Sequence, residues 1–76
     1  MEFERLAELI GSVLNLPADK IRREATLKEL GADSLDVFQI VIAIEEELQI
    51  EVDPAVAEKL RTVGDVADAI ERVTRS

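Results

Sequence analysis

The chain has 76 residues, with nine basic and seventeen acidic side chains and a formal net charge of −8. It contains neither cysteine nor histidine, which excludes disulfide bonds, thiolate metal sites and catalysis by a histidine base. The negative charge argues against nucleic acid and against an anionic membrane as partners, because like charges repel. A chain of this size forms one small domain, and we expect that domain to fill residues 1–76.

Apolar residues at helical spacing predict a first amphipathic helix over roughly residues 2–15, with Pro17 at or just beyond its end. A connection of about seventeen residues follows, which is longer than most structureless loops. Thr26 followed by Glu29 is a capping-box pattern for one short helical turn within it, and Gly31 would end that turn. Four apolar residues are expected to anchor the connection in the core: Leu16, Ile21, Leu27 and Leu30.

A second helix is predicted from about Ser34 to Leu48. Asp33 is a good N-cap, and Asp36 falls in the first turn, where the helix dipole favours negative charge. Its apolar residues form two stripes on a helical wheel. The core stripe contains Val37, Ile40, Val41, Ile44 and Leu48, and the second stripe contains Leu35, Phe38 and Ile42.

Two further helices are predicted after this segment. Asp53 before Pro54 indicates the start of a short third helix, which would hold Val56, Ala57 and Leu60. Thr62 with Asp65 resembles a capping box for the last helix, whose apolar stripe is Val63, Val66, Ala67, Ile70 and Val73. No segment alternates apolar and polar residues for long. The chain is therefore predicted to be all-α, a small four-helix bundle of three longer helices and one short helix with a long, pinned first loop.

The second stripe of the predicted helix 34–48 has two interpretations. Leu35, Phe38 and Ile42 could pack under the long first loop, or they could form an exposed seam that contacts a partner. Every charge from Glu29 to Glu58 is negative. An acidic run is often only a solvated face, but beside an apolar seam it suits a docking surface, because charge steers the encounter and apolar contact holds it.

Ser34 stands at the start of this helix. A serine there is usually a cap, but Asp33 can take that role and leave the hydroxyl available. The chain has no histidine, and no Ser-x-x-Lys pattern follows, so another protein would have to activate the hydroxyl. The helix start favours an anion such as a phosphate ester, although Asp33 and Asp36 oppose one.

The chain resembles the acyl carrier proteins over essentially its whole length. The resemblance is carried by Gly31-Ala32-Asp33-Ser34-Leu35-Asp36, by Glu45-Glu46-Glu47-Leu48 and by Ala57-Glu58-Lys59-Leu60-Arg61-Thr62-Val63. It implies that Ser34, flanked by Asp33 and Leu35, carries 4′-phosphopantetheine. A separate phosphopantetheinyl transferase would deliver this arm from coenzyme A. The terminal thiol of the arm would hold acyl groups as thioesters.

The resemblance also implies a docking surface for that transferase and for acyl-processing enzymes with basic patches. Leu35 and Ile42 would sit in shallow apolar pockets of these partners, and Phe38 and Gln39 would lie on the same surface. The acids that would meet Arg and Lys are Asp33, Asp36, Glu45, Glu46 and Glu51. The bundle core could open to hold the acyl chain, lined by Leu6, Ile10, Val41, Ile44, Leu60 and Ile70.

Three positions depart from the common fatty-acid carriers. Gln39 replaces a usual acid, Ile42 a frequent methionine, and Phe38 an aliphatic residue. These differences favour a specialised carrier in fatty-acid, lipid or polyketide synthesis. An aminoacyl or peptidyl carrier, or an acidic helical adaptor without a prosthetic group, are the alternatives. In each case we expect a non-catalytic monomer. We also expect it to be cytoplasmic and not to insert into membranes, since the chain has neither an apolar run long enough to span a bilayer nor a signal peptide.

Overall fold

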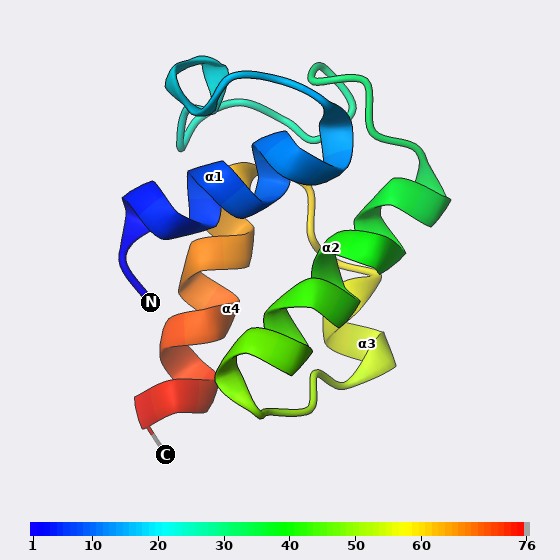
Figure 1. Cartoon of the computed structure of the whole chain (residues 1–76). Coiled ribbons are helices and arrows are strands. Elements are labelled where there is room, and N and C mark those ends of the chain that lie inside the picture. The colour runs from blue at the N-terminus through cyan, green and yellow to red at the C-terminus, as the bar shows by residue number, and fades with distance from the viewer. Residues whose placement is uncertain (76) are drawn as a thin grey trace.

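The computed structural model describes residues 1–75, and its helices pack into one bundle (Figure 1). The elements are α1 (Phe3–Leu14), the 3₁₀ helix η1 (Ala18–Lys20), α2 (Ser34–Leu48), α3 (Pro54–Ala57) and α4 (Val63–Arg75). The only β pairing within the described residues is an isolated antiparallel bridge. The all-α prediction of three longer helices and one short one is therefore confirmed. None of the helices in this part of the chain has the length and apolarity needed to cross a bilayer.

The first two long helices end in the same way. Asn15 follows α1 in the left-handed conformation at φ 62°, and its N–H donates to the carbonyl of Gly11. Gln49 follows α2 at φ 56°, and its N–H donates to the carbonyl of Glu45. A left-handed residue of this kind satisfies a carbonyl that the helix leaves unpaired. The predicted bounds of both helices are confirmed to within a residue at each end.

The third helix is shorter than the prediction. It ends at Ala57, and Leu60 lies beyond it, half-buried. The chain after Ala57 pairs with the long loop: the carbonyl of Arg61 accepts a hydrogen bond from the N–H of Leu27 at 2.8 Å. A helix that continued past Leu60 could not present that carbonyl to the loop. The single turn η1 was also absent from the prediction.

The core is built from α1, α2 and α4. Leu6, Ile10, Ile40, Ile44, Val63 and Val66 are its largest fully buried side chains, and the described residues bury no polar or charged side chain. Among the side chains expected to line an acyl chamber, Leu60 is half-buried and the other five are buried. Aliphatic burial of this kind is the main source of stability in so small a domain.

The long first loop is pinned, as predicted. It runs back along α1 to η1 and then returns to deliver the chain to α2 (Figure 1). Ile21 and Leu27 are buried, and Leu16 and Leu30 pack against the core. An antiparallel bridge joins Thr26 to Thr62. The loop is thus attached to the start of α4 as well as to the core.

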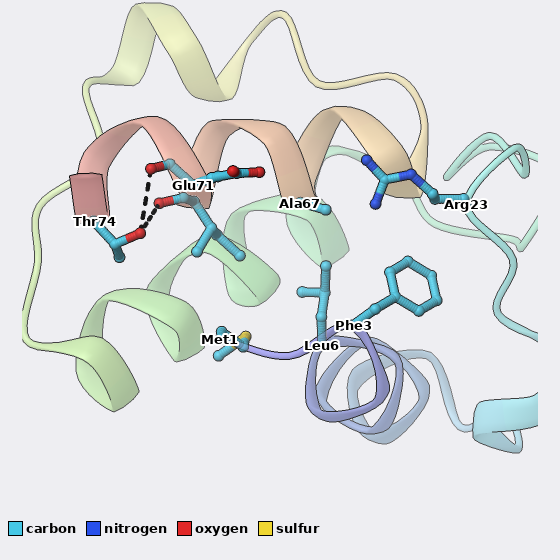
Figure 2. Close-up of a pocket in the computed structure, with 8 residues that line it drawn as sticks. Met1, Phe3, Leu6, Arg23, Ala67, Glu71 and Thr74 are labelled. Carbon is cyan, nitrogen blue, oxygen red and sulfur yellow. Dashed lines mark hydrogen bonds between the residues drawn. The ribbon is translucent and has the colours of Figure 1, made fainter. Parts of the chain in front are cut away.

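Arg23 makes a second attachment of the same loop. Its guanidinium pairs with Asp68 of α4 at 2.9 Å and lies 5.9 Å from the centre of the Phe3 ring. Figure 2 shows this arginine beside a pocket of about 160 Å³ between α1 and α4. Leu6 and Ile70 line that pocket, and none of its lining residues belongs to α2. The pocket therefore lies apart from the start of α2.

Candidate functional site

The start of α2 is held by a capping box made of two aspartates. The Asp33 carboxylate accepts a hydrogen bond from the Asp36 N–H at 2.9 Å, and the Asp36 carboxylate accepts one from the Asp33 N–H at 3.1 Å. The carbonyl of Asp33 also accepts from the N–H of Val37 at 3.0 Å. The prediction that Asp33 caps the helix is confirmed.

Ser34 is the first residue of α2 and is exposed. Within residues 1–75 its hydroxyl makes no hydrogen bond, and the capping bond to the Asp36 N–H comes from Asp33 instead. The backbone N–H groups of Ser34 and Leu35 also have no partner in this part of the chain. Unpaired N–H groups at a helix start attract phosphate. The local structure therefore fits a phosphate ester on the Ser34 oxygen.

Gly31 completes the approach to this site. It adopts φ 90°, and a β-carbon at this position would meet no neighbouring atom. The predicted capping box just before it is present, with the Glu29 carboxylate accepting from the Thr26 N–H at 2.9 Å and the Thr26 hydroxyl accepting from the Glu29 N–H at 3.0 Å. The hydrogen bond from the Thr26 N–H lowers the pKa of Glu29. Gly31 then turns the chain toward Asp33.

The second apolar stripe of α2 is exposed rather than packed under the loop. Leu35 is 63% exposed, Phe38 60% and Ile42 37%. The interpretation of these residues as an exposed seam is confirmed. A fourth exposed apolar residue is Val56 of α3, at 40%.

The polar residues assigned to docking differ in their surroundings. Asp33, Gln39, Glu46 and Glu51 are exposed, whereas Asp36 and Glu45 are half-buried. The Glu45 carboxylate accepts a hydrogen bond from the N–H of Val52 at 2.7 Å. Sequence patterns could not reveal this contact, because it joins a helix to a loop. Glu45 therefore supports the connection between α2 and α3.

Glu47 also has an internal partner. Its two carboxylate oxygens accept hydrogen bonds from the Arg5 guanidinium of α1, 42 residues away. This interaction lowers the pKa of Glu47. Within residues 1–75, Glu47 is the only acid of the segment 29–58 that forms an ion pair. The other acids of that segment have no cationic partner among the described residues, although several of them accept hydrogen bonds from backbone N–H groups.

Comparison with known proteins identifies the family. The model of the phosphopantetheine attachment site matches residues 4–70. The acyl carrier protein of Clostridium perfringens (strain SM101) is 44% identical over 69 residues, covering 90% of this chain and 91% of the relative. The chain belongs to the acyl carrier protein family. The acyl carrier protein of Clostridium acetobutylicum is 40% identical over 75 residues, which cover 97% of each chain.

Solved acyl carrier proteins share the fold. The crystal structure of one from Thermotoga maritima superposes with a TM-score of 0.84 at 27% identity, covering 93% of this chain and 84% of that one. The solution structure of a holo acyl carrier protein from Nitrosomonas europaea gives 0.82 at 25% identity, covering 97% and 96%. The matched family model shows that phosphopantetheine is the prosthetic group of this chain. The role of an acyl carrier protein implies an acyl cargo and enzymes that process that cargo.

Proposed function

We propose that Ser34 carries the 4′-phosphopantetheine arm and that this chain presents acyl thioesters to enzymes of fatty-acid, lipid or polyketide synthesis. The observation that supports this most strongly is the spare hydroxyl at the start of α2. It is exposed, and Asp33 caps the helix in its place. The bundle packs as one unit around one core, which supports a single carrier domain over residues 1–76.

In this proposal the chain's own residues hold the arm and catalyse nothing. The arm supplies a thiol, which a chain without cysteine otherwise lacks. Ser34 would supply the ester oxygen, and the unpaired N–H groups of Ser34 and Leu35 would favour the negative charge of the phosphate. The phosphopantetheinyl transferase would join the Ser34 oxygen to the phosphorus of the arm and release adenosine 3′,5′-bisphosphate from coenzyme A. Since this chain has no histidine and the Asp33 and Asp36 carboxylates are engaged in the capping box, we assign the base that removes the serine proton to the transferase. In this proposal the chain is a carrier and not a catalyst. We further propose that it works as a monomer in the cytoplasm, where it meets this transferase.

The same proposal assigns the docking surface to α2 and the loop after it. Asp33, Asp36, Glu46 and Glu51 would steer basic patches of the transferase and of acyl-processing enzymes toward Ser34. Leu35, Phe38 and Ile42 would supply apolar contact. Gln39 lies among them without charge. Glu45 would contribute mainly by shaping the surface, since its carboxylate is engaged by Val52.

The test is to load the chain with coenzyme A and a broad-specificity phosphopantetheinyl transferase and to weigh the intact protein. We expect the mass of one phosphopantetheine on the native chain and none on Ser34→Ala. Ser12→Ala is the matched control, because Ser12 is also exposed but lies inside α1. It should be loaded like the native chain. A native chain that several active transferases leave unmodified would favour an adaptor without a prosthetic group.

A further inference from the structure

The pocket between α1 and α4 has no role in the proposed attachment of the arm. Its apolar lining is formed by Met1, Phe3, Leu6, Ala67 and Ile70. Leu6 and Ile70 are buried members of the core, so the pocket reaches the interior of the bundle. A cavity of about 150 Å³ lined by Leu, Ile and Phe side chains can bind benzene. The volume of about 160 Å³ therefore has room for an apolar group of about six carbons.

One basic side chain lines this pocket. Arg23 reaches it from the long loop, and its guanidinium lies 5.9 Å from the centre of the Phe3 ring. In Figure 2 Arg23 and Met1 lie on opposite sides of Leu6. Ligand sites in proteins are mostly apolar, with a few polar groups that fix the orientation of the ligand. A cation beside an apolar cavity suits a molecule with an apolar tail and an anionic head.

The Arg23 guanidinium has hydrogen-bond donors to spare. It carries five N–H groups, and within residues 1–75 its hydrogen-bond partner is a single oxygen of Asp68, 2.9 Å from Nη2. The two side chains are 54% and 60% exposed, and exposed ion pairs contribute little to stability. A carboxylate in the pocket can therefore join or displace Asp68 at little cost, and it can accept two parallel N–H bonds from the guanidinium.

The remaining polar groups of the pocket are already engaged. The Thr74 hydroxyl donates to the carbonyls of Ile70 at 2.9 Å and of Glu71 at 3.3 Å. The Glu71 carboxylate pairs with Arg75 at 3.4 Å, which offsets the repulsion that it would exert on an anion. Arg23 is thus the group that orients a ligand, with the anionic head at the long loop and the tail against the apolar lining.

We propose that this pocket binds a free straight-chain carboxylic acid of about six carbons, reversibly and without a covalent bond. Arg23 holds the carboxylate, and the tail packs against Leu6 and Ile70. A monocarboxylic acid that has been joined to a thiol as a thioester no longer has a carboxylate, so a tethered acyl group cannot make the Arg23 contact. The ligand is therefore the unattached acid. Because it binds the folded chain, it also stabilises the fold as its concentration rises.

The experiment is a titration of the isotope-labelled native chain with sodium hexanoate, followed through the amide chemical shifts. We expect saturable shifts at the pocket residues, with a dissociation constant on the order of 1 mM for a ligand of about eight non-hydrogen atoms. Acetate lacks the tail and hexanol lacks the charge, so each should bind at least about tenfold more weakly. Shifts that never saturate, or that map to α2 instead of the pocket, would overturn the site.

Two substitutions test the role of the guanidinium. Arg23→Gln should weaken hexanoate binding about tenfold, because it removes the charged donor. Arg22→Gln is the matched control, since Arg22 is the adjacent exposed arginine and does not line the pocket. It should bind hexanoate like the native chain. Equal weakening by both substitutions would mean that hexanoate responds only to the overall charge of the loop.

A third substitution separates binding from stability. Asp68→Asn breaks the same ion pair as Arg23→Gln but leaves the guanidinium in place. It should tighten hexanoate binding about two- to threefold, because an exposed competitor for Arg23 has lost its charge. Weaker binding in Asp68→Asn would show that the pair matters only for the fold, and would remove the proposed site.

A last variant keeps this site distinct from the attachment of the arm. Ser34→Ala should bind hexanoate with the affinity of the native chain, because the pocket has no lining residue from α2. A loss of hexanoate binding in Ser34→Ala would contradict an independent site. Failure of the native chain to be loaded at Ser34 would remove the proposed function and leave the hexanoate titration to decide this one.

Discussion

The Glu45 carboxylate accepts a hydrogen bond from the backbone N–H of Val52, 2.7 Å away, and so joins the last turns of α2 to the segment before α3. The adjacent acid, Glu46, is exposed, and its carboxylate has no partner within residues 1–75. These two consecutive glutamates therefore have different roles. Glu45 supports the shape of the surface, and Glu46 presents negative charge on it.

This difference predicts opposite effects of two alanine variants. Glu45→Ala should lower the free energy of unfolding by about 1 kcal/mol, because it leaves the half-buried Val52 N–H without its charged acceptor. Glu46→Ala should leave that free energy unchanged or raise it slightly, and should slow loading at low salt. Urea unfolding and loading kinetics on both variants give the comparison. Equal stability losses would mean that the Val52 contact has no energetic weight.

The capping box predicts a second contrast, between Asp33 and Ser34. Asp33→Ala should cost about 1 kcal/mol of stability, because it removes the acceptor for the Asp36 N–H. Ser34→Ala should cost little, because the Ser34 hydroxyl makes no hydrogen bond within the described chain. Chemical denaturation of both variants measures the difference. A loss on Ser34→Ala as large as on Asp33→Ala would show that the hydroxyl is a cap after all.

Asp65 predicts a dependence of stability on pH. Its carboxylate accepts hydrogen bonds from the N–H groups of Thr62 and Arg61 at 3.1 and 3.0 Å, and these lower its pKa in the folded chain. A carboxylate with a lowered folded pKa stabilises the fold above its unfolded pKa, and this contribution disappears as the pH falls through the folded value.

Asp65→Asn should therefore be less stable than the native chain at neutral pH and equally stable in acid. Glu29→Gln should behave in the same way, since the pKa of Glu29 is also lowered. Unfolding of the three proteins over a pH series tests the prediction. A cost of Asp65→Asn that stays constant down to the lowest pH would contradict it.

Ionic strength should also change stability. The segment from Glu29 to Glu58 holds nine acids and no basic residue, and only Glu47 has an ion-pair partner among the described residues. Screening weakens the repulsion between the remaining acids. The melting temperature should therefore rise with added sodium chloride, and rise less steeply for Glu46→Ala. A melting temperature that does not respond to salt would count against uncompensated repulsion.

The features predicted correctly are those encoded within one turn or one helix. The capping boxes at Thr26, Asp33 and Thr62 place both partners three residues apart, a spacing that a sequence displays directly. The exposed seam of Leu35, Phe38 and Ile42 follows from helical periodicity together with the charges around it. Local spacing determines the capping boxes and the membership of the stripe, whereas the structure was needed to show that the stripe is exposed rather than packed under the loop.

Apart from the single turn η1, the features that were missed depend on contacts between distant segments. The Arg5 to Glu47 pair spans 42 residues, and the Thr26 to Thr62 bridge joins the long loop to the last helix. Periodicity carries no signal for either. The third helix was predicted too long for the same reason, because its end is set by the pairing of Arg61 with Leu27.

The two-aspartate box at the head of α2 has a consequence for how the protein is used. Because the fold makes no demand on the Ser34 oxygen, esterifying or freeing that atom breaks none of the hydrogen bonds that hold the helix start. If Ser34 bears the arm as proposed, the folded scaffold is the same before and after the modification, so a partner that recognises the bundle meets one shape in both forms.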